Sequence, residues 1–316
     1  MKNHAPHHKD IADILGSVQD RDHYTVIRDF FELSAISIRN AVDFGRDRET
    51  YETRYKAIAE KYRKEYLDII ASAFAMLGAQ ILKAANGDIP FADWAGEIYM
   101  DSGTSNGRAG QFFTPYHVSH LMAECSLERD EVLGRIGKDP DDVITIYEPT
   151  CGAGGLIVAS IDVLKGYGVN YAWNVFVDCG DIDSRCVHMT YVTLSLLGVP
   201  AVVRLGDALL MKYHEAWFTP AYLMAWPHFK KQIGRGNYPN SATVPKSSDP
   251  QEKPQEAAPE PPKEETQELA TAFSETAPSM APAEAAADAE SPKAADVPRM
   301  PENMPRVEKN GQLRLF

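Results

Sequence analysis

The sequence predicts an α/β protein, in which a helical segment precedes an incomplete Rossmann-like segment and a disordered C-terminal tail follows. Three observations carry this prediction. Apolar residues recur at helical spacing up to about residue 100, and short apolar runs then alternate with helical stretches up to about residue 210. Beyond about residue 238, Pro, Ala, Glu, Ser and Thr dominate. With 316 residues and 44% hydrophobic content, the chain has room for at most two folded units.

The first hundred residues show the three- and four-residue steps of amphipathic helices. The repeating apolar positions are Ile11, Ile14, Leu15, Val26, Ile27, Phe30, Phe31, Leu33, Tyr66, Ile69, Ile70, Phe74, Leu77 and Ile81. Residues 86–90, Asn-Gly-Asp-Ile-Pro, break the last helix, and residues 101–110, rich in Gly and Ser, indicate a loop. We therefore predict a helical N-terminal domain over residues 1–105.

Residues 106–235 have the pattern of an α/β domain. Three short runs have strand chemistry, at residues 143–147, 174–178 and 201–205. Residues 156–164 and 184–197 lie between them, and each stretch is long enough for a crossover helix. A strand-helix-strand-helix-strand order is typical of a doubly wound sheet, here with fewer strands than a complete one.

Residues 236–311 are predicted to form a disordered tether, because so few apolar side chains cannot offset the chain entropy of folding. From Asp249 to Phe316 there are 14 acidic and 7 basic residues, a net charge of −7. That segment holds about half of the chain's net charge of −13. The overall charge disfavours a broad electrostatic grip on nucleic acid, but it leaves room for a local basic groove on the folded part.

Several classes of protein are disfavoured by composition. No run of 18 apolar residues is present and the N-terminus lacks the apolar stretch of a signal peptide, so we expect a cytoplasmic protein that does not enter a membrane. The four cysteines show no paired spacing, which predicts reduced thiols rather than a zinc site or a disulfide framework. They are Cys125, Cys151, Cys179 and Cys186.

The most informative segment is residues 148–155, Glu-Pro-Thr-Cys-Gly-Ala-Gly-Gly, where the first predicted strand turns into a helix. Glycines let the backbone approach a ligand closely, and an acid at the strand end accepts hydrogen bonds from a charged or hydroxylated cofactor. A phosphate-binding turn would favour helix amides and cations over a carboxylate.

Residues 148–155 are similar to the S-adenosylmethionine motif of adenine-N6 DNA methyltransferases, and most of all to modification subunits of type I restriction systems. Upstream, residues 110–115, Gly-Gln-Phe-Phe-Thr-Pro, resemble the second cofactor motif of this family, which precedes the glycine turn. Residues 95–99, Ala-Gly-Glu-Ile-Tyr, resemble the family's approach to that motif. The resemblance covers residues 90 to 210, and the helical first hundred residues fit the family's N-terminal domain.

This resemblance implies a Rossmann-like S-adenosylmethionine-dependent methyltransferase domain and DNA adenine-N6 methylation within restriction-modification. DNA and S-adenosylmethionine are then the expected partner and cofactor. Asp181, at the end of the second strand, matches the acid that accepts the ribose hydroxyls, and Asp207, at the end of the third, matches a position near the adenine ring or the target amine. The predicted cofactor residues are Phe113, Thr114, Pro115, Glu148, Pro149, Thr150, Cys151, Gly152, Gly154, Gly155, Asp181, Ile182 and Asp207.

Simpler interpretations remain open for some of these positions. Asp183 is equally suited to capping the next helix. Cys151 is better interpreted as a small packing residue than as a nucleophile, since no His/Asp constellation accompanies it. His117 and His120 would supply half of a metal site, but no further ligands have matching spacing, so no metal is predicted. Phe112 and Phe113 suit a hydrophobic core, although their place beside Thr114 and Pro115 favours a cofactor role.

The family holds the target adenine with an Asn- or Asp-Pro-Pro-aromatic tetrapeptide, and the sequence does not contain one. The nearest segments are residues 219–222, Thr-Pro-Ala-Tyr, and 226–229, Trp-Pro-His-Phe. Thr219, Pro220 and Tyr222 are therefore the candidates for catalysis, while helix starts or loop punctuation are the preferred interpretation.

The predicted tail begins about thirty residues after Asp207, which leaves no room for the later strands or a target-recognition domain. Activity would then need an unusual acceptor set within residues 217–229 or a partner chain that completes the site. The alternative is a catalytically inactive, methyltransferase-like protein with a DNA-associated or regulatory role.

The last five residues, Gln-Leu-Arg-Leu-Phe, form an apolar peptide at the end of a polar tether. They resemble the peptide by which bacterial polymerases and repair proteins bind the β sliding clamp. Leu313, Leu315 and Phe316 would fill a hydrophobic pocket while Gln312 forms hydrogen bonds. We therefore predict that residues 312–316 place the protein at the replication clamp.

Overall fold

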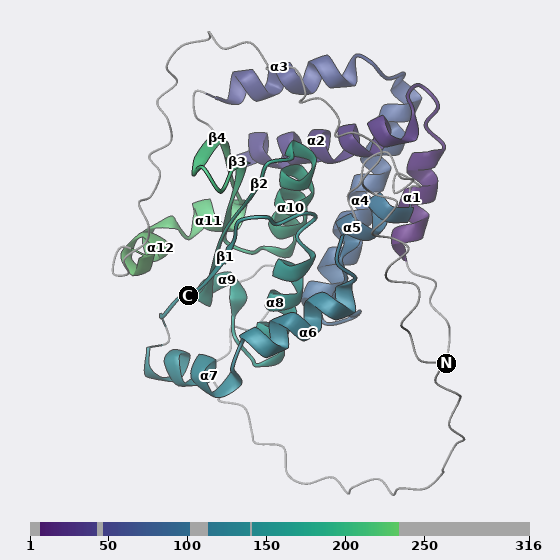
Figure 1. The fold of residues 1–316 in the computed structure, drawn as a ribbon. Coiled ribbons are helices and arrows are strands. Elements are labelled where there is room, and N and C mark those ends of the chain that lie inside the picture. The colour runs from purple at the N-terminus through teal and green to yellow at the C-terminus, as the bar shows by residue number, and fades with distance from the viewer. Residues whose placement is uncertain (1–6, 43–46, 102–112, 140, 234–316) are drawn as a thin grey trace, which may run out of the picture. The chain divides into compact units, whose positions relative to one another are not determined.

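The computed structural model describes residues 7–42, 47–101, 113–139 and 141–233 (Figure 1). All of these described residues belong to one compact unit, within Met1–Asp249. The predicted tether 236–311, the clamp peptide 312–316, and Gly110, Gln111 and Phe112 of the upstream motif all lie outside the described residues.

The described residues of the N-terminal part form five helices: α1 (His7–Gly16), α2 (His23–Val42), α3 (Arg48–Ala59), α4 (Lys64–Asn86) and α5 (Trp94–Tyr99). Their apolar stripes are buried, as the helical spacing predicts: Ile11, Phe30 and Leu77 are fully shielded from solvent. Helix α4 ends where the Asn-Gly pair predicts, because Gly87 adopts a left-handed φ of 85° that L side chains disfavour.

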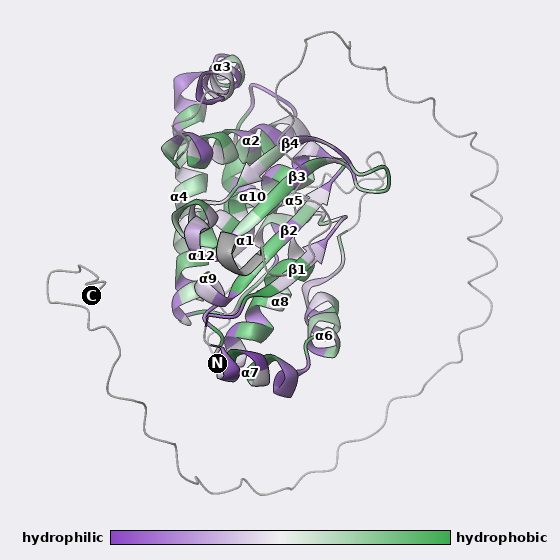
Figure 2. Ribbon diagram, turned by 90° about the vertical axis from the view of Figure 1, so that its left-hand side faces the viewer, coloured by the Kyte–Doolittle hydropathy of each residue, from purple (hydrophilic) through white to green (hydrophobic). Residues whose placement is uncertain are grey.

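A four-stranded sheet contains β1 (Ile144–Glu148), β2 (Val175–Asp181), β3 (Ala201–Asp207) and β4 (Lys212–Phe218), in that spatial order. Strands β1 to β3 are parallel and match the three predicted strands to within a few residues. Strand β4, which the sequence did not predict, returns antiparallel beside β3, so that Phe218 pairs with Val202 and Lys212 with Asp207. Figure 2 colours β2 and β3 mostly green, as expected of buried parallel strands.

Helices cover both faces of the sheet. Helix α8 (Gly155–Gly166) follows β1, and α10 (Ser184–Leu197) follows β2 and packs against α2 and α4. On this face Val177, Val203 and Trp217 join one core with the N-terminal helices. On the other face Phe176 and Val202 pack with residues of α11 (Pro220–Met224) and α12 (Trp226–Ile233).

Three further helices complete the described part: α6 (Tyr116–Ser126), which packs against α8, α7 (Arg129–Lys138) and the short α9 (Tyr171–Asn174). The α/β fold class is thus confirmed, with an incomplete Rossmann-like sheet after a helical segment. The boundary predicted at residue 105 falls within residues 102–112, outside the described part, and stays a prediction.

By length and composition alone, α4 would be able to cross a membrane, although a single such helix is weak evidence. In the fold it contacts α1 and α10 and buries Ile70, Leu77 and Ile81 in the main core.

Candidate cofactor-binding site

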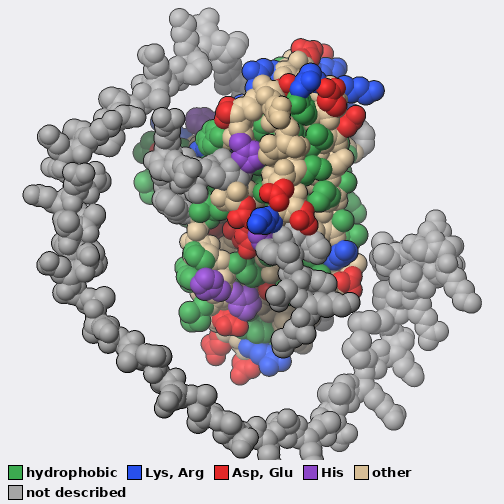
Figure 3. Space-filling model, turned by 90° about the vertical axis from the view of Figure 1, so that its right-hand side faces the viewer, with side chains coloured by type: hydrophobic (Ala, Val, Ile, Leu, Met, Phe, Trp, Pro, Cys, Tyr) green, Lys and Arg blue, Asp and Glu red, His purple; other side chains and the backbone are tan. Residues whose placement is uncertain are grey.

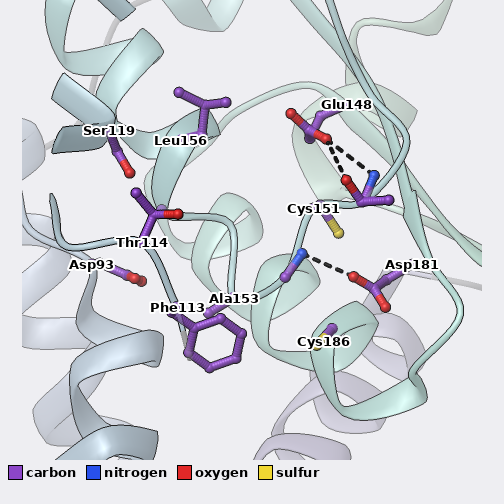
Figure 4. Close-up of a pocket in the computed structure, with 13 residues that line it drawn as sticks. Asp93, Phe113, Thr114, Ser119, Glu148, Cys151, Ala153, Leu156, Asp181 and Cys186 are labelled. Atoms are coloured by element: carbon purple, nitrogen blue, oxygen red, sulfur yellow. Dashed lines mark hydrogen bonds between the residues drawn. The ribbon is translucent and has the colours of Figure 1, made fainter. Parts of the chain in front are cut away.

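A pocket of about 490 Å³ opens at the carboxyl ends of β1 and β2, within the size range of small-molecule sites (Figure 4). Ligands of open α/β sheets bind at this edge, where strands give way to helices. The pocket is lined by Asp93, Phe113, Thr114, Ser119, Glu148, Thr150, Cys151, Gly152, Ala153, Gly155, Leu156, Asp181 and Cys186.

The turn between β1 and α8 forms the floor of the pocket, and its shape depends on two glycines. Gly152 and Gly154 have φ of 54° and 91°, in the left-handed region. A Cβ on Gly154 would lie 3.1 Å from Thr190 Oγ1, and one on Gly152 would lie 3.3 Å from the Phe113 ring. Phe113 of the upstream motif therefore packs directly over the glycine turn, so the two predicted cofactor segments meet in space.

Hydrogen bonds from neighbouring elements fix this turn. The Cys151 N–H donates to the Gly180 carbonyl at 2.8 Å, and Thr190 Oγ1 donates to the Gly152 carbonyl at 2.9 Å. The Gly152 N–H in turn donates to Asp181 Oδ2 at 3.0 Å. The turn is thus tied to β2 and α10, which holds its backbone in place for a ligand.

Two carboxylates come from the strand ends. Asp181 also accepts the Asp183 N–H through Oδ1 at 2.9 Å, and burial raises the pKa of Asp181 above its ordinary value. Glu148 accepts both the N–H and the hydroxyl of Thr150 at 3.1 Å. Both acids have part of their hydrogen-bonding capacity left for a ligand.

A third carboxylate comes from Asp93, which the sequence analysis did not single out. Its Oδ1 accepts the Gly96 N–H at 3.0 Å and caps the N-terminus of α5. Asp93 is only 5% exposed, and burial raises its pKa to about 6, although the Gly96 hydrogen bond lowers it. The capping position was readable from the sequence, but its place in the pocket depends on packing between distant segments.

The electrostatics of the pocket favour a cationic ligand. Among the described residues, its lining contains three carboxylates and no Lys, Arg or His side chain. A phosphate-bearing nucleotide would meet three acids without a compensating cation, whereas a positively charged ligand is complementary to them.

The structure brings eight of the predicted cofactor residues to this pocket: Phe113, Thr114, Glu148, Thr150, Cys151, Gly152, Gly155 and Asp181. Pro115, Pro149, Gly154, Ile182 and Asp207 do not line it. Gly154 is part of the turn and has the left-handed backbone conformation that begins α8. Ile182 is 74% exposed beside Asp181, and the Asp207 side chain accepts the Leu210 N–H at 2.9 Å. Sequence reasoning missed Asp93, Ser119, Ala153, Leu156 and Cys186.

The structure also bears on the simpler interpretations of Asp183, the cysteines and the two histidines. Asp183 does cap α10 by accepting the Arg185 N–H at 2.9 Å, while its neighbour Asp181 faces the pocket. Cys179 and Cys186 are buried, and burial raises the pKa of both thiols, which suits packing rather than nucleophilic chemistry. His120 lies 3.6 Å from Glu124 and Asp162, and no cluster of three metal-ligating side chains occurs among the described residues.

The candidates for catalysis lie at the opposite edge of the sheet. Because β4 runs antiparallel to β3, it ends beside the start of β3, where the Thr219 N–H donates to the Ala201 carbonyl. Thr219 caps α11, Pro220 occupies its first turn, and Tyr222 is buried against Phe176 and Phe229. The structure therefore does not bring Thr219, Pro220 or Tyr222 to the pocket, and their positions match the helix start that we preferred.

A mostly parallel sheet with a glycine turn and acids at the ends of its first two strands is typical of the Rossmann-like class of folds. Residues 96–265, more than half of the chain, match the N-6 DNA Methylase family model, and the chain belongs to that family. The predicted resemblance to N6 DNA methyltransferases is thereby confirmed. No curated protein matches the chain.

Two solved structures are similar at low identity. One is a putative class I S-adenosylmethionine-dependent methyltransferase from Listeria monocytogenes, with 13% identity, a TM-score of 0.34, and coverage of 72% of this chain and 67% of that one. The other is the methyltransferase subunit of a type I restriction-modification system from Streptococcus thermophilus, with 16% identity and a TM-score of 0.32. The match covers 64% of this chain and 58% of that subunit.

Proposed function

We propose that this protein binds S-adenosylmethionine and serves in the methylation of DNA at adenine N6. The observation that carries the proposal is the pocket itself, whose described lining brings the glycine turn, Phe113 and three carboxylates together without a basic side chain. S-adenosylmethionine fits that chemistry, since it has a sulfonium, an ammonium and a ribose diol. Family membership supports the same cofactor and the same base.

Each part of the pocket has a role in holding this cofactor. Asp181, at the end of β2, is placed to accept the ribose hydroxyls, and the exposed Ile182 next to it offers an apolar contact for the adenine ring. Gly152 leaves its turn open to close approach, while Phe113 and Thr114 close the pocket from the upstream motif. The cofactor supplies a methyl group activated by the positively charged sulfur.

Methyl transfer also requires acceptors that hold the target amine, and we propose that a partner polypeptide supplies them. The sequence lacks the family's tetrapeptide, and Thr219 to Tyr222 lie at the far edge of the sheet. Strand β1, which leads into the pocket, pairs only with β2 among the described strands, so its other side is available to a further strand. A strand added there would end beside the pocket.

The charge distribution on one face of the protein also favours a partner that contributes to DNA binding. On the face shown in Figure 3, acidic and basic side chains of the described residues are interspersed rather than gathered in a basic strip. Affinity for duplex DNA depends mainly on Lys and Arg at phosphates, so a partner would strengthen it.

The cofactor proposal is tested by isothermal titration of the full chain with S-adenosylmethionine. Asp181→Asn keeps one oxygen for the Gly152 N–H but replaces the other with an NH2 group, which cannot accept the ribose hydroxyls or the Asp183 N–H, so we expect roughly 10-fold weaker binding. Asp130→Asn, the same exchange on the exposed first turn of α7, should bind like the wild type. Absence of binding to the wild-type chain would refute the proposal.

The second candidate function is a methyltransferase-like protein without activity, which the missing tetrapeptide favours. An assay that measures the transfer of labelled methyl groups to unmethylated DNA distinguishes the active from the inactive protein. It is carried out with the purified chain alone and again with host extract added. Incorporation that needs the extract and disappears in Gly152→Asp supports the partner proposal. Incorporation by the chain alone refutes both the inactive protein and the need for a partner.

A further inference from the structure

Asp93 is enclosed against the glycine turn by two elements far apart in the sequence. A Cβ added to Gly155, the first residue of α8, would lie 2.8 Å from Asp93 Oδ2. A Cβ added to Gly96 of α5 would lie 2.2 Å from the same oxygen. Both elements therefore have a glycine where the carboxylate sits, and only small residues leave it room.

This carboxylate has no basic partner among the described residues, although it is nearly buried. The backbone N–H of Gly96 donates to Oδ1, Oδ2 lies beside the pocket-lining residue Gly155, and Asp93 itself lines the pocket. The other deeply buried acid among the described residues is Asp29. Its carboxylate forms an ion pair with Arg28 at 2.8 Å and accepts a hydrogen bond from the Tyr62 hydroxyl at 2.8 Å. A buried, unpaired carboxylate is costly unless a ligand compensates its charge.

Asp93 and Asp181 lie on opposite sides of the pocket, with Phe113 and Ala153 between them (Figure 4). The hydroxyl-bearing residues Thr114 and Ser119 lie on the Asp93 side. The ribose of S-adenosylmethionine lies between its adenine and its methionine moiety. With the ribose at Asp181 and the adenine beside the exposed Ile182, as proposed above, the methionine moiety and its positively charged α-ammonium extend toward Asp93.

We propose that Asp93 binds the α-ammonium of the methionine moiety of S-adenosylmethionine. The assignment rests on the proposed function, because it places that cofactor in the pocket. Asp93 would form a charge-assisted hydrogen bond through Oδ2 while Oδ1 continues to cap α5. It is then a specificity-determining residue, which distinguishes the amino acid from analogues that lack the amine.

The test compares S-adenosylmethionine with its 2-oxo analogue, in which a keto group replaces the ammonium and the sulfonium is retained. The wild-type chain should bind the analogue roughly 10- to 100-fold more weakly, the value of a buried hydrogen bond between charged groups. Asp93→Asn retains the cap on α5 and should lose this preference, whereas Asp130→Asn should keep it. Circular dichroism verifies that all three proteins are folded.

Proton release supplies an independent readout. In the unliganded protein the pKa of Asp93 is about 6, mainly because of burial. Among the described residues, Glu97 of α5 raises this pKa further, and Tyr116 of α6 also interacts with Asp93. An ammonium would lower this pKa, so binding at pH 6 should release roughly half a proton, measured by calorimetry in buffers of different ionisation enthalpy. The 2-oxo analogue and Asp93→Asn should each remove that release.

The outcomes separate this assignment from the cofactor proposal. If Asp93→Asn keeps the full preference for S-adenosylmethionine over its 2-oxo analogue, the Asp93 assignment is wrong although the cofactor proposal stands. If the wild-type chain binds neither compound, both fail.

Discussion

Asp93 lowers the stability of the fold at neutral pH, because its carboxylate is buried. Its pKa rises from an ordinary value near 3.8 to about 6 in the folded protein, which means that the folded state favours the protonated form. The contribution of Asp93 to the free energy of unfolding is therefore fully present below pH 3.8 and is lost as the pH rises through 6. At neutral pH the ionised form costs on the order of 3 kcal/mol.

Asp93→Asn should therefore stabilise the free protein at pH 7.5. The amide keeps the cap on α5 and removes the buried charge, so we expect a gain of about 1–3 kcal/mol in the free energy of unfolding. Urea denaturation between pH 4.5 and 8 measures it. The gain should grow up to about pH 6 and then level off, and a gain independent of pH would contradict the raised pKa of Asp93.

Gly154→Ala should disturb the turn that forms the pocket. The φ of 91° is strained for alanine, and the new Cβ would meet Thr190 at 3.1 Å, so we expect a loss of about 1–3 kcal/mol in stability and weaker cofactor binding. Gly134→Ala is the matched control, because Gly134 lies within α7 with no atom near its Cβ position. Alanine there should stabilise the protein by about 0.5–1 kcal/mol, as measured by thermal unfolding.

Among the elements, β4 separates this chain from a simple succession of parallel strands. Its exposed and half-buried residues Lys212, His214 and Glu215 alternate weakly with apolar ones, and only Trp217 is fully buried. Trp217 packs against Tyr51 and Tyr191, so β4 is held by α3 and α10 as well as by β3. The reversed direction of β4 is what carries Thr219 away from the pocket.

Thr219→Ala tests whether that segment is structural. The hydroxyl accepts the Ala201 N–H and donates to the Val199 carbonyl, both at 2.8 Å, in a fully buried position. We expect a loss of about 1–3 kcal/mol in the free energy of unfolding, because a buried N–H and carbonyl lose their partner. Affinity for S-adenosylmethionine should stay at the wild-type value. A large fall in affinity at unchanged stability would restore Thr219 as a candidate site residue.

The elements that sequence reasoning located are those with strong local signals. Strands β1 to β3 are short apolar runs, and α10 begins at the capping residue Asp183 and ends before Gly198. Helix α6 was indicated only by the pair His117 and His120, three residues apart on one predicted helix, whereas α7 was missed because it buries only Val132 and its periodicity is faint. Strand β4 was missed because tertiary contacts, rather than alternation, determine it.

The candidate site was accessible from the sequence only in part. The glycine turn and Asp181 have a fixed spacing along the chain, and a family resemblance accompanies them. Asp93 lies about sixty residues before Gly155, and the contact between them depends on how α5 packs beside α8. Side chains such as Ser119 and Cys186 line the pocket for the same reason, and no local pattern marks them.

In the molecule as a whole, the clamp peptide stays a proposal, since residues 312–316 lie outside the described part. Deletion of these five residues should abolish binding to an immobilised bacterial β clamp, because Leu313, Leu315 and Phe316 supply the apolar contacts. Affinity for S-adenosylmethionine should be unchanged in the same truncated protein. Full clamp binding by the truncated chain would eliminate this proposal.

Among the described strands β1 pairs on one side only, and this has a consequence for how methylation would respond to the supply of a partner. On the proposal that a second polypeptide docks there, the competent species is a complex whose amount follows the product of two concentrations. Diluting an extract tenfold would then lower its methylation by about a hundredfold when the complex is sparsely populated. A cell would thereby regulate the reaction through the dosage of the second gene, while this chain remains loaded with its methyl donor.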